Sequence, residues 1–295
     1  MITEKVDLDG RPFTLDRPDS PPEDGVVFVL NLHGAGSLGP WQREYFPVHD
    51  HVDEFGLVVA TPTARTTSPF RRWVAEADDA YLQAVVEDVL ARYPGRVRSF
   101  WLAGHSQGSI TSNRLLRTDW WADRVDGWLS LSGVRLGQVT VVEGFGPPAQ
   151  PGQPSLAALP PEARARMFGV ARGLPEGEFS FVYAVGEHEI VALPETSPWA
   201  ERFGGGTRVR LDDVVDEQPG RVHDTRPGTP TRAWGGPPAP GTAEVYVYPE
   251  LEGDRVVADV LRRDKGHTEG LEPRVVRTLV ELVARAPGGK LQPAG

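Results

Sequence analysis

A serine between two glycines is the first group in this chain that is placed to do chemistry. Gly104-His105-Ser106-Gln107-Gly108 has the form G-x-S-x-G and follows the apolar stretch 97–103. Glycine on both sides lets the backbone make a tight, strained turn that presents the serine hydroxyl. A helical pattern begins at Gln107, so its backbone N–H is expected at a helix N-terminus, where it can bind a developing oxyanion. The motif predicts Ser106 as a nucleophile.

A second glycine-containing segment, His33-Gly34-Ala35-Gly36, directly follows the apolar stretch 26–32. Such a loop supplies a second backbone N–H to the oxyanion, and Ala35 is the expected donor. The same segment continues to Gly39 and matches the dinucleotide fingerprint G-x-G-x-x-G. However, Pro40 follows the third glycine where a helix should already run, and the next expected strand ends without a ribose-binding acid. We therefore expect no nucleotide cofactor.

A histidine near the C-terminus is the expected general base. His267 lies in Gly266-His267-Thr268-Glu269-Gly270, between the last expected strand and the last expected helix. A histidine at this place can return to a serine at the edge of the same sheet. The order serine, acid, histidine along the chain is typical of sites built on a strand–turn–helix serine.

The acid that would orient this histidine is expected after the apolar stretch 179–185. Glu187 and Glu189 both follow that stretch, and Glu189 is the preferred candidate. Glu187, Asp212 and Asp213 stay open as alternatives. The acid is expected to hold the imidazole and to stabilise its protonated form.

With GHSQG, HGAG, GEHE and KGHTEG in place, the chain resembles the feruloyl esterase and polyhydroxybutyrate depolymerase-like branch of the α/β-hydrolases. The likeness extends to residues 11–18 (RPFTLDRP), Trp73, Asp78-Asp79 and the hairpin before GHTEG. It implies ester hydrolysis through an acyl-serine, with the serine, histidine and glutamate named above carried over. An amidase, lactonase or acyltransferase would use the same groups, and an inactive binding protein of this fold is a further alternative. Glutamate stands where aspartate is usual, and cysteine, which is frequent in that branch, is absent.

The elements that must position these groups alternate along the chain. Apolar, β-branched stretches predict buried strands, and apolar residues at i, i+3 and i+4 predict helices between them. The expected strands are 26–32, 57–60, 97–103, 128–131 and 179–185, followed by a hairpin of 245–248 and 256–261. The expected helices are 76–93, 107–117 and 272–286. This order predicts a single domain over 1–295 with the α/β-hydrolase fold, a mostly parallel sheet flanked by helices.

Two segments interrupt the alternation and are rich in proline and glycine. Residues 144–177, with a possible helix at 156–170, and residues 194–241 are predicted as insertions over the active-site face. Tryptophans in the loops are candidate substrate-binding residues. They are Trp41, Trp73, Trp199 and Trp234.

Composition excludes several classes of function. The 295 residues carry a formal net charge of -10, so neither nucleic acid nor an anionic membrane is an expected partner. No cysteine is present, which excludes disulfides and thiolate catalysis. His49 and His51 lack an obvious third ligand, and no metal is expected. Neither a secretory signal nor an apolar run of membrane-spanning length is visible, so a cytoplasmic location is expected, with a secreted protein trimmed of its signal as the alternative. The resemblance implies a small-molecule or polymer-derived ester as substrate.

Overall fold

The computed structural model describes most of the chain. The described residues are 1–137, 139–142, 145–146, 160, 162–163, 173–226 and 231–292. The predicted helix at 156–170 and most of the predicted insertion 144–177 lie outside these residues.

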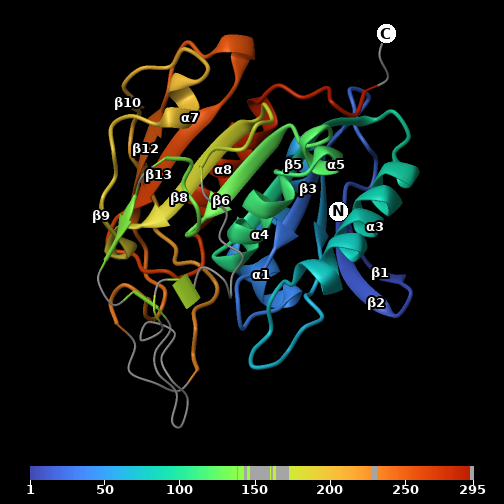
Figure 1. Ribbon diagram of the computed structural model, residues 1–295, viewed down its shortest axis with the longest axis horizontal. Coiled ribbons are helices and arrows are strands. Elements are labelled where there is room, and N and C mark those ends of the chain that lie inside the picture. The colour runs from blue at the N-terminus through green and yellow to red at the C-terminus, as the bar shows by residue number, and fades with distance from the viewer. Residues whose placement is uncertain are drawn as a thin grey trace.

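An eleven-stranded mixed sheet forms the centre of the described part of the molecule (Figure 1). Its strands lie in the order β1-β2-β4-β3-β5-β6-β8-β13-β12-β10, and β11 pairs with β12. Neighbouring strands run parallel from β4 to β13, and pairing is antiparallel outside them. The strands of this sheet are β1 Ile2–Leu8, β2 Arg11–Arg17, β3 Val26–Leu32, β4 Leu57–Thr61, β5 Val97–His105, β6 Gly127–Leu131, β8 Ser180–Gly186, β10 Val209–Arg210, β11 Val214–Val215, β12 Thr242–Val247 and β13 Val257–Arg262. A separate pair consists of β7 Thr140–Val141 and β9 Ile190–Ala192.

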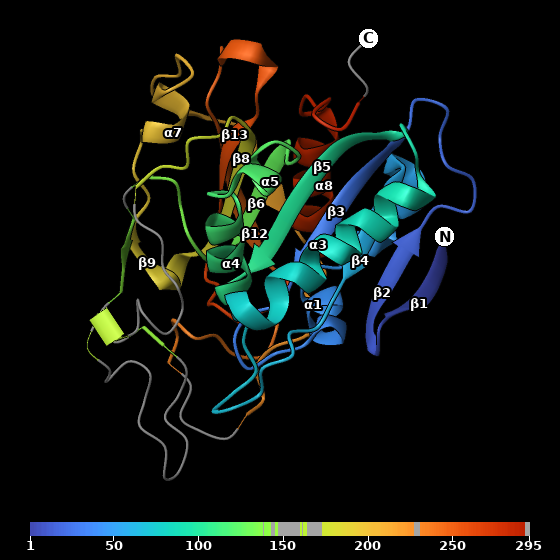
Figure 2. The ribbon, with the colours of Figure 1, turned by 45° about the vertical axis from the view of Figure 1, so that its right-hand side comes forward.

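Helices cover both faces of the sheet (Figure 2). The α-helices are α1 Gly39–Tyr45, α2 Val52–Phe55, α3 Ala75–Arg92, α4 Gln107–Leu115, α5 Asp119–Ala122, α7 Pro198–Glu201 and α8 Pro273–Arg285. Short 3-10 helices are η1 Val48–His51, η3 Glu187–Glu189 and η4 Glu252–Asp254. Apolar side chains of α3, α4, α5 and α7 pack on one face, and those of α1, η1, α2 and α8 pack on the other.

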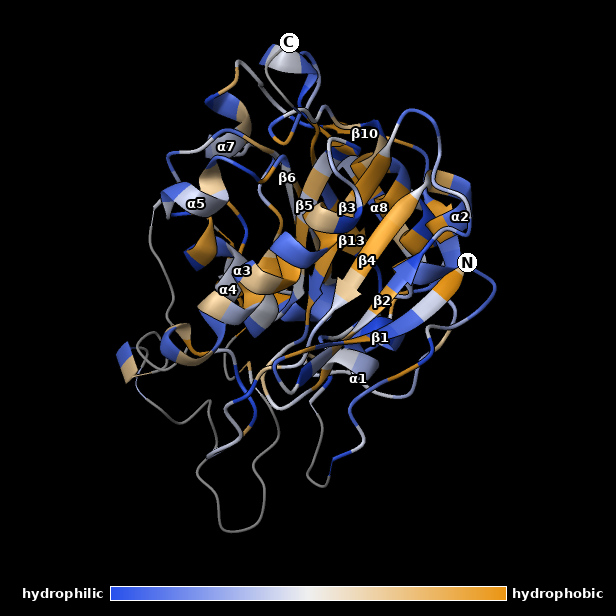
Figure 3. Ribbon diagram, turned by 90° about the vertical axis from the view of Figure 1, so that its right-hand side faces the viewer, coloured by the Kyte–Doolittle hydropathy of each residue, from blue (hydrophilic) through white to orange (hydrophobic). Residues whose placement is uncertain are grey.

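The parallel strands are mostly apolar because both of their faces are covered, as β3 and β4 show (Figure 3). In β3, Val26, Phe28 and Leu30 belong to the core under α3, whereas Val27 and Val29 belong to the core under α8. This alternation follows from the period of two along a strand. The rigid two-sided core fixes the strand ends from which the functional loops leave.

The observed sheet confirms the predicted fold class. Every expected strand has a counterpart among β3, β4, β5, β6, β8, β12 and β13, with bounds that differ by at most a few residues. The N-terminal hairpin of β1 and β2 was not expected as a pair of strands. No helix within the described residues is both long and apolar enough to cross a bilayer.

The predicted insertion 194–241 does not lie wholly over the expected active-site edge. The arrows of β3, β5 and β8 point toward the bottom of Figure 1, whereas α7 lies near the top, at the opposite end of the sheet. From α7 the chain runs along β10 and β11, both antiparallel to β12, and so reaches the carboxyl ends of the parallel strands. Only the part of this insertion after β11 is therefore placed to approach the site.

Candidate active site

The serine motif forms the turn between β5 and α4. Ser106 has φ 52° and ψ -115°, a strained conformation for a residue with a side chain. The glycines make the turn possible. A Cβ on Gly104 would lie 2.4 Å from the carbonyl carbon of Gly108, and one on Gly108 would lie 2.2 Å from the carbonyl oxygen of Leu32. The turn therefore packs through Gly108 against the end of β3.

We call residues 33–36, which follow β3, the oxyanion loop. Its glycine at position 34 packs on the serine turn, because a Cβ there would lie 2.8 Å from His105 Nδ1 and 3.2 Å from Ser106 Cβ. Among the described residues, the backbone N–H of Ala35 donates no hydrogen bond within the protein, and neither does that of Gln107 at the first position of α4. Two free N–H groups thus flank the serine, as an oxyanion site requires.

Gln107 and Trp73 join the serine turn to the oxyanion loop. The Gln107 side chain accepts the Trp73 N–H at 3.0 Å and donates to the Trp73 carbonyl at 2.8 Å. The Trp73 indole N–H in turn donates to the His33 carbonyl at 2.8 Å. Trp73 is 3% exposed and its ring packs on the His33 ring, 4.7 Å between centroids. The structure places this tryptophan beneath the oxyanion loop as a support, and not on a surface that a substrate could contact.

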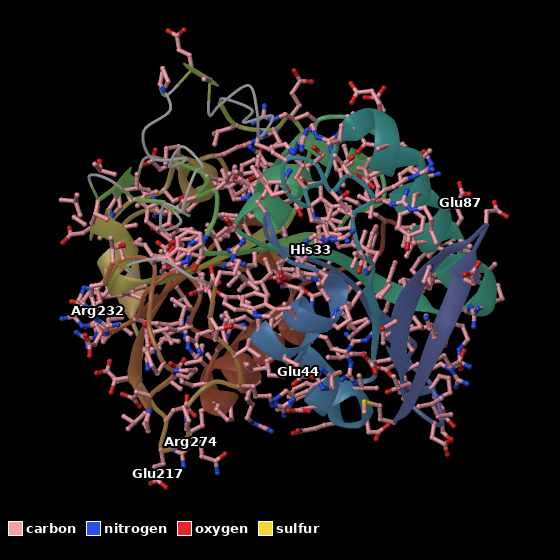
Figure 4. All side chains as sticks on the ribbon, turned by 90° about the horizontal axis from the view of Figure 1, so that it is seen from below. His33, Glu44, Glu87, Glu217, Arg232 and Arg274 are labelled. Atoms are coloured by element: carbon pink, nitrogen blue, oxygen red, sulfur yellow. The ribbon has the colours of Figure 1, made fainter. Side chains whose placement is uncertain are left out.

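His33 is held as a neutral ring at the base of the loop. Its Nδ1–H donates to the Gly34 carbonyl at 2.7 Å, and its Nε2 accepts the Ala64 N–H at 3.0 Å. Burial lowers the pKa of His33 to about 4, and the nearby positive charge of Arg71 acts in the same direction. Viewed from the carboxyl ends of the strands, His33 lies near the centre of the molecule, whereas Glu87 and Arg232 lie near its periphery (Figure 4).

His267 and Glu189 form a buried pair at the ends of two neighbouring strands. His267 follows β13 and Glu189 follows β8, and His267 Nδ1 lies 2.7 Å from Glu189 Oε2. The other carboxylate oxygen, Oε1, accepts the Ser132 hydroxyl and the Gly186 N–H, each at 2.7 Å. Three donors therefore fix the carboxylate. Because Nδ1 carries the proton in this contact, Nε2 of His267 is free to act as a base.

The alternative acids point elsewhere. Glu187 is turned to the surface, where it accepts the Asp264 N–H at 2.8 Å and pairs with Arg263 at 3.0 Å. Asp213 pairs with Arg210 on the exposed edge of the sheet, and Asp212 is also exposed. Of the candidate acids, the structure brings only Glu189 to His267.

His105, the residue before the nucleophile, connects the serine turn to the base. Its Nε2–H donates to the His267 carbonyl at 2.9 Å, and the two rings lie 4.7 Å apart. On its other side the His105 ring packs on Tyr45 of α1, with 4.1 Å between centroids. Burial lowers the pKa of His105 well below its ordinary value, so the ring stays a neutral donor.

The loop that carries the base is further held by buried charges. Arg262 donates to the carbonyls of Glu269 and Gly270 at 2.9 and 2.8 Å, and it pairs with Glu272 at 2.9 Å. The side chains of Arg262 and Glu272 are each 2% exposed. Such a pair satisfies the backbone of the loop and resists its displacement.

The four candidate tryptophans fall in different places. Trp41 packs on Tyr45 and His105 at 5.1 and 5.7 Å, and Trp234 packs on His267 at 4.8 Å, so both lie at the site. Trp199 does not. It is fully buried in α7, stacked on Phe179 at the opposite end of the sheet. Sequence position alone could not separate it from Trp234.

Several residues near the base were not expected from the sequence. Phe145 packs edge-on against His267, with 4.9 Å between ring centroids. Asp224 accepts the Trp234 indole N–H at 2.9 Å and holds that ring in place. Ser132, which binds Glu189, directly follows β6, and that position at a strand end was a signal that could have identified it. Asp224 and Phe145 belong to irregular segments with no comparable signal.

No group of three His, Cys, Asp or Glu residues in the described part of the chain is arranged to hold a metal ion.

Neither a family model nor a curated protein sequence matches the chain. An acetyl xylan esterase from Aspergillus awamori superimposes over 96% of this chain and 99% of its own, with a TM-score of 0.53 and 14% identity.

Two further structures match in part. A fluorophosphonate-binding serine hydrolase of Staphylococcus aureus has 13% identity and a TM-score of 0.39, over 63% of this chain and 78% of its own. Est1E from Butyrivibrio proteoclasticus, with ferulic acid bound, has 15% identity and a TM-score of 0.38, over 62% and 78%. With TM-scores below 0.5, these two matches do not support the fold assignment, which depends on the acetyl xylan esterase. At these identities the likeness concerns the fold, and together with the strand order it shows that this chain has the α/β-hydrolase fold.

Proposed function

We propose that this protein is a serine hydrolase that cleaves carboxylic esters through an acyl-serine intermediate. The hydrogen bond of 2.7 Å between His267 Nδ1 and Glu189 Oε2 carries the proposal, because it leaves the opposite ring nitrogen as a base beside the serine turn. The strained backbone of Ser106 and the free N–H groups of Ala35 and Gln107 support it. The nearly full-length likeness to an acetyl xylan esterase favours ester chemistry.

In the proposed mechanism, Ser106 Oγ attacks the acyl carbonyl while His267 Nε2 takes the hydroxyl proton. The N–H groups of Ala35 and Gln107 bind the oxyanion, and Glu189 stabilises the imidazolium. His267 then protonates the departing alcohol. Water, deprotonated by the same nitrogen, attacks the acyl-serine and releases the acid and the free serine.

The decisive variant is Ser106→Ala. We expect it to lower kcat for an activated ester such as p-nitrophenyl acetate by on the order of 10³-fold or more, with the same melting temperature to within a few degrees. Near-wild-type turnover would refute the proposal. A fluorophosphonate probe should label the wild type and not this variant, and absence of labelling in the wild type would instead indicate an inactive binding protein.

A further inference from the structure

Two arginines contact Gly36 of the oxyanion loop, Arg226 through its guanidinium and Arg71 through its backbone carbonyl. A Cβ on Gly36 would lie 2.3 Å from Arg226 Nη1, so this guanidinium occupies the space that a side chain would take. The Gly36 N–H donates to the carbonyl of Arg71 at 2.7 Å. Gly36 has φ 74°, and Arg226 fills the space of a Cβ, so glycine is needed at this position. Two cationic residues therefore border the residue next to Ala35, the proposed oxyanion donor.

Arg226 keeps one nitrogen available for a ligand. Its Nε lies 2.9 and 3.0 Å from the two oxygens of Asp224, and its Nη2 lies 2.6 Å from one of them. Nη1, the nitrogen that faces Gly36, makes no hydrogen bond to any described residue, and the side chain is 41% exposed. Asp224 is 8% exposed and also holds the Trp234 indole, so it fixes the direction of the guanidinium. The free edge of Arg226 is thus held toward the oxyanion loop.

The charge of Arg71 is not balanced by a carboxylate. Its Nη1 donates to the Ala64 carbonyl at 2.6 Å, and no ion pair of Arg71 is present among the described residues. Segment 64–75 also contains Arg65 and Arg72 and no acidic residue, although the whole chain has a net charge of -10. Asp78, whose carboxylate accepts the Arg65 N–H, is fully buried and already paired with Arg11 at 2.6 Å.

We propose that Arg226 and Arg71 make the site selective for esters that carry a carboxylate within a few bonds of the scissile carbonyl. This inference rests on the proposed function and names its substrate class. A guanidinium nitrogen with free N–H groups binds a carboxylate by a charge-assisted hydrogen bond, and the unbalanced positive charge of Arg71 strengthens the attraction. Arg226 Nη1 lies against Gly36, the residue after Ala35. A substrate whose ester carbonyl binds the Ala35 N–H and whose carboxylate binds Arg226 therefore has only a short spacer between the two groups.

The test compares kcat/KM within two matched pairs of esters. Monoethyl glutarate against ethyl pentanoate places the carboxylate on the acyl side, and 3-acetoxybenzoate against its methyl ester places it on the alcohol side. We expect the wild type to prefer the charged member of at least one pair by about tenfold or more. In that pair Arg226→Gln and Arg71→Gln should each lower the ratio of charged to neutral substrate several-fold. Raising NaCl from 0.05 to 0.5 M should lower the ratio as well, because salt screens a partly exposed charge.

Arg285→Gln is the matched control, since it removes the same charge at the last residue of α8, far from the site. It should leave the ratio at the wild-type value. Hydrolysis of the neutral esters without preference for the charged partner in either pair overturns this inference and leaves the proposed function intact. If the wild type hydrolyses none of the four esters and does not hydrolyse p-nitrophenyl acetate either, the proposed function itself is overturned. Equal ratios in the wild type and both arginine variants also overturn the inference, even if a preference exists.

Discussion

At the scale of single residues, the donors around Glu189 decide how the base is protonated. Ser132 and Gly186 both donate to Oε1, so that position must be an acceptor. In Glu189→Gln the amide oxygen would take Oε1's place and its NH₂ would face His267 Nδ1. A donor at that place favours the ring tautomer whose proton is on Nε2, which cannot accept a proton from serine.

Glu189→Gln should therefore lower kcat by on the order of 10²- to 10⁴-fold and leave KM within a few-fold of the wild type. Glu187→Gln is the matched control from the same turn, because within the described residues the Glu187 carboxylate has only Arg263 and the Asp264 N–H as polar partners, both at the surface. Steady-state kinetics on p-nitrophenyl acetate check both. A larger loss in Glu187→Gln than in Glu189→Gln would assign the acid to the other glutamate.

His105 is a positioning residue whose contribution can be isolated. His105→Phe keeps a ring against Tyr45 but removes the donor to the His267 carbonyl. Of the donors in the described part of the chain, that carbonyl would then retain only the Tyr45 hydroxyl at 3.4 Å. We expect kcat to fall by about tenfold with little change in KM, because the base loses orientation and not substrate contact. His105→Gln, which can still donate, should recover part of kcat. Equal kcat in the two variants would mean that the hydrogen bond has no role in positioning.

At the scale of elements, the two-sided core of the sheet was predictable and its edges were not. Continuous apolar runs such as β3 have no other stable place than between two layers. In β1 exposed and half-buried residues alternate, and its ITEKVDL sequence is too polar to stand out as a strand. The turn between β1 and β2 contains Asp9-Gly10, both with positive φ, and an Asp-Gly pair is a sequence signal for a hairpin.

Some residues of the candidate site were likewise predictable from the sequence and others were not. Ser106 and His267 are tied to short motifs beside strand ends, and local sequence suffices to propose them. The tertiary contacts are different, since Ser132, Asp224 and Phe145 are brought together from segments far apart in the chain. Glu189 could be separated from Glu187 only by the geometry of η3, which turns one side chain inward and the other outward. No periodicity encodes such a difference.

The oxyanion loop is an element whose stability depends on pH through His33. In the folded protein the pKa of His33 is about 4, against an ordinary 6.5 in the unfolded chain. Between these values the unfolded chain binds a proton that the folded protein does not. The contribution of neutral His33 is therefore full above about pH 6.5 and declines as the pH falls toward 4.

At pH 5 the loss attributable to His33 should be about 2 kcal/mol relative to pH 7. Urea unfolding of the wild type and His33→Gln at both pH values measures it. The variant should be less stable at pH 7 but should lose less free energy of unfolding between the two pH values than the wild type. His51→Asn, a change on the outer surface of η1, should retain the wild-type difference. An unchanged difference in His33→Gln would show that this ring is not the source.

At the scale of the whole molecule, the sheet separates two tryptophans that lie in one predicted insertion. Trp234 reaches the carboxyl ends of the strands, packs on His267 and is 8% exposed. Trp199 lies at the amino ends, is fully buried, stacks on Phe179 at 4.4 Å and donates to its carbonyl at 3.2 Å. Trp234 is therefore placed to affect substrate selectivity, whereas Trp199 is placed to affect packing at the opposite end of the domain.

The last prediction follows from this separation. Trp234→Ala should change the ratio of kcat/KM between a bulky ester and an acetate ester by about 5- to 150-fold, equivalent to about 1–3 kcal/mol of binding lost with a large apolar contact. Trp199→Phe should leave that ratio unchanged and lower the melting temperature by several degrees, because a smaller ring leaves the stack on Phe179 incompletely filled and removes its hydrogen bond. Both variants are measured in both assays. A selectivity change in Trp199→Phe, or a purely thermal effect in Trp234→Ala, would contradict the assignment of the two ends.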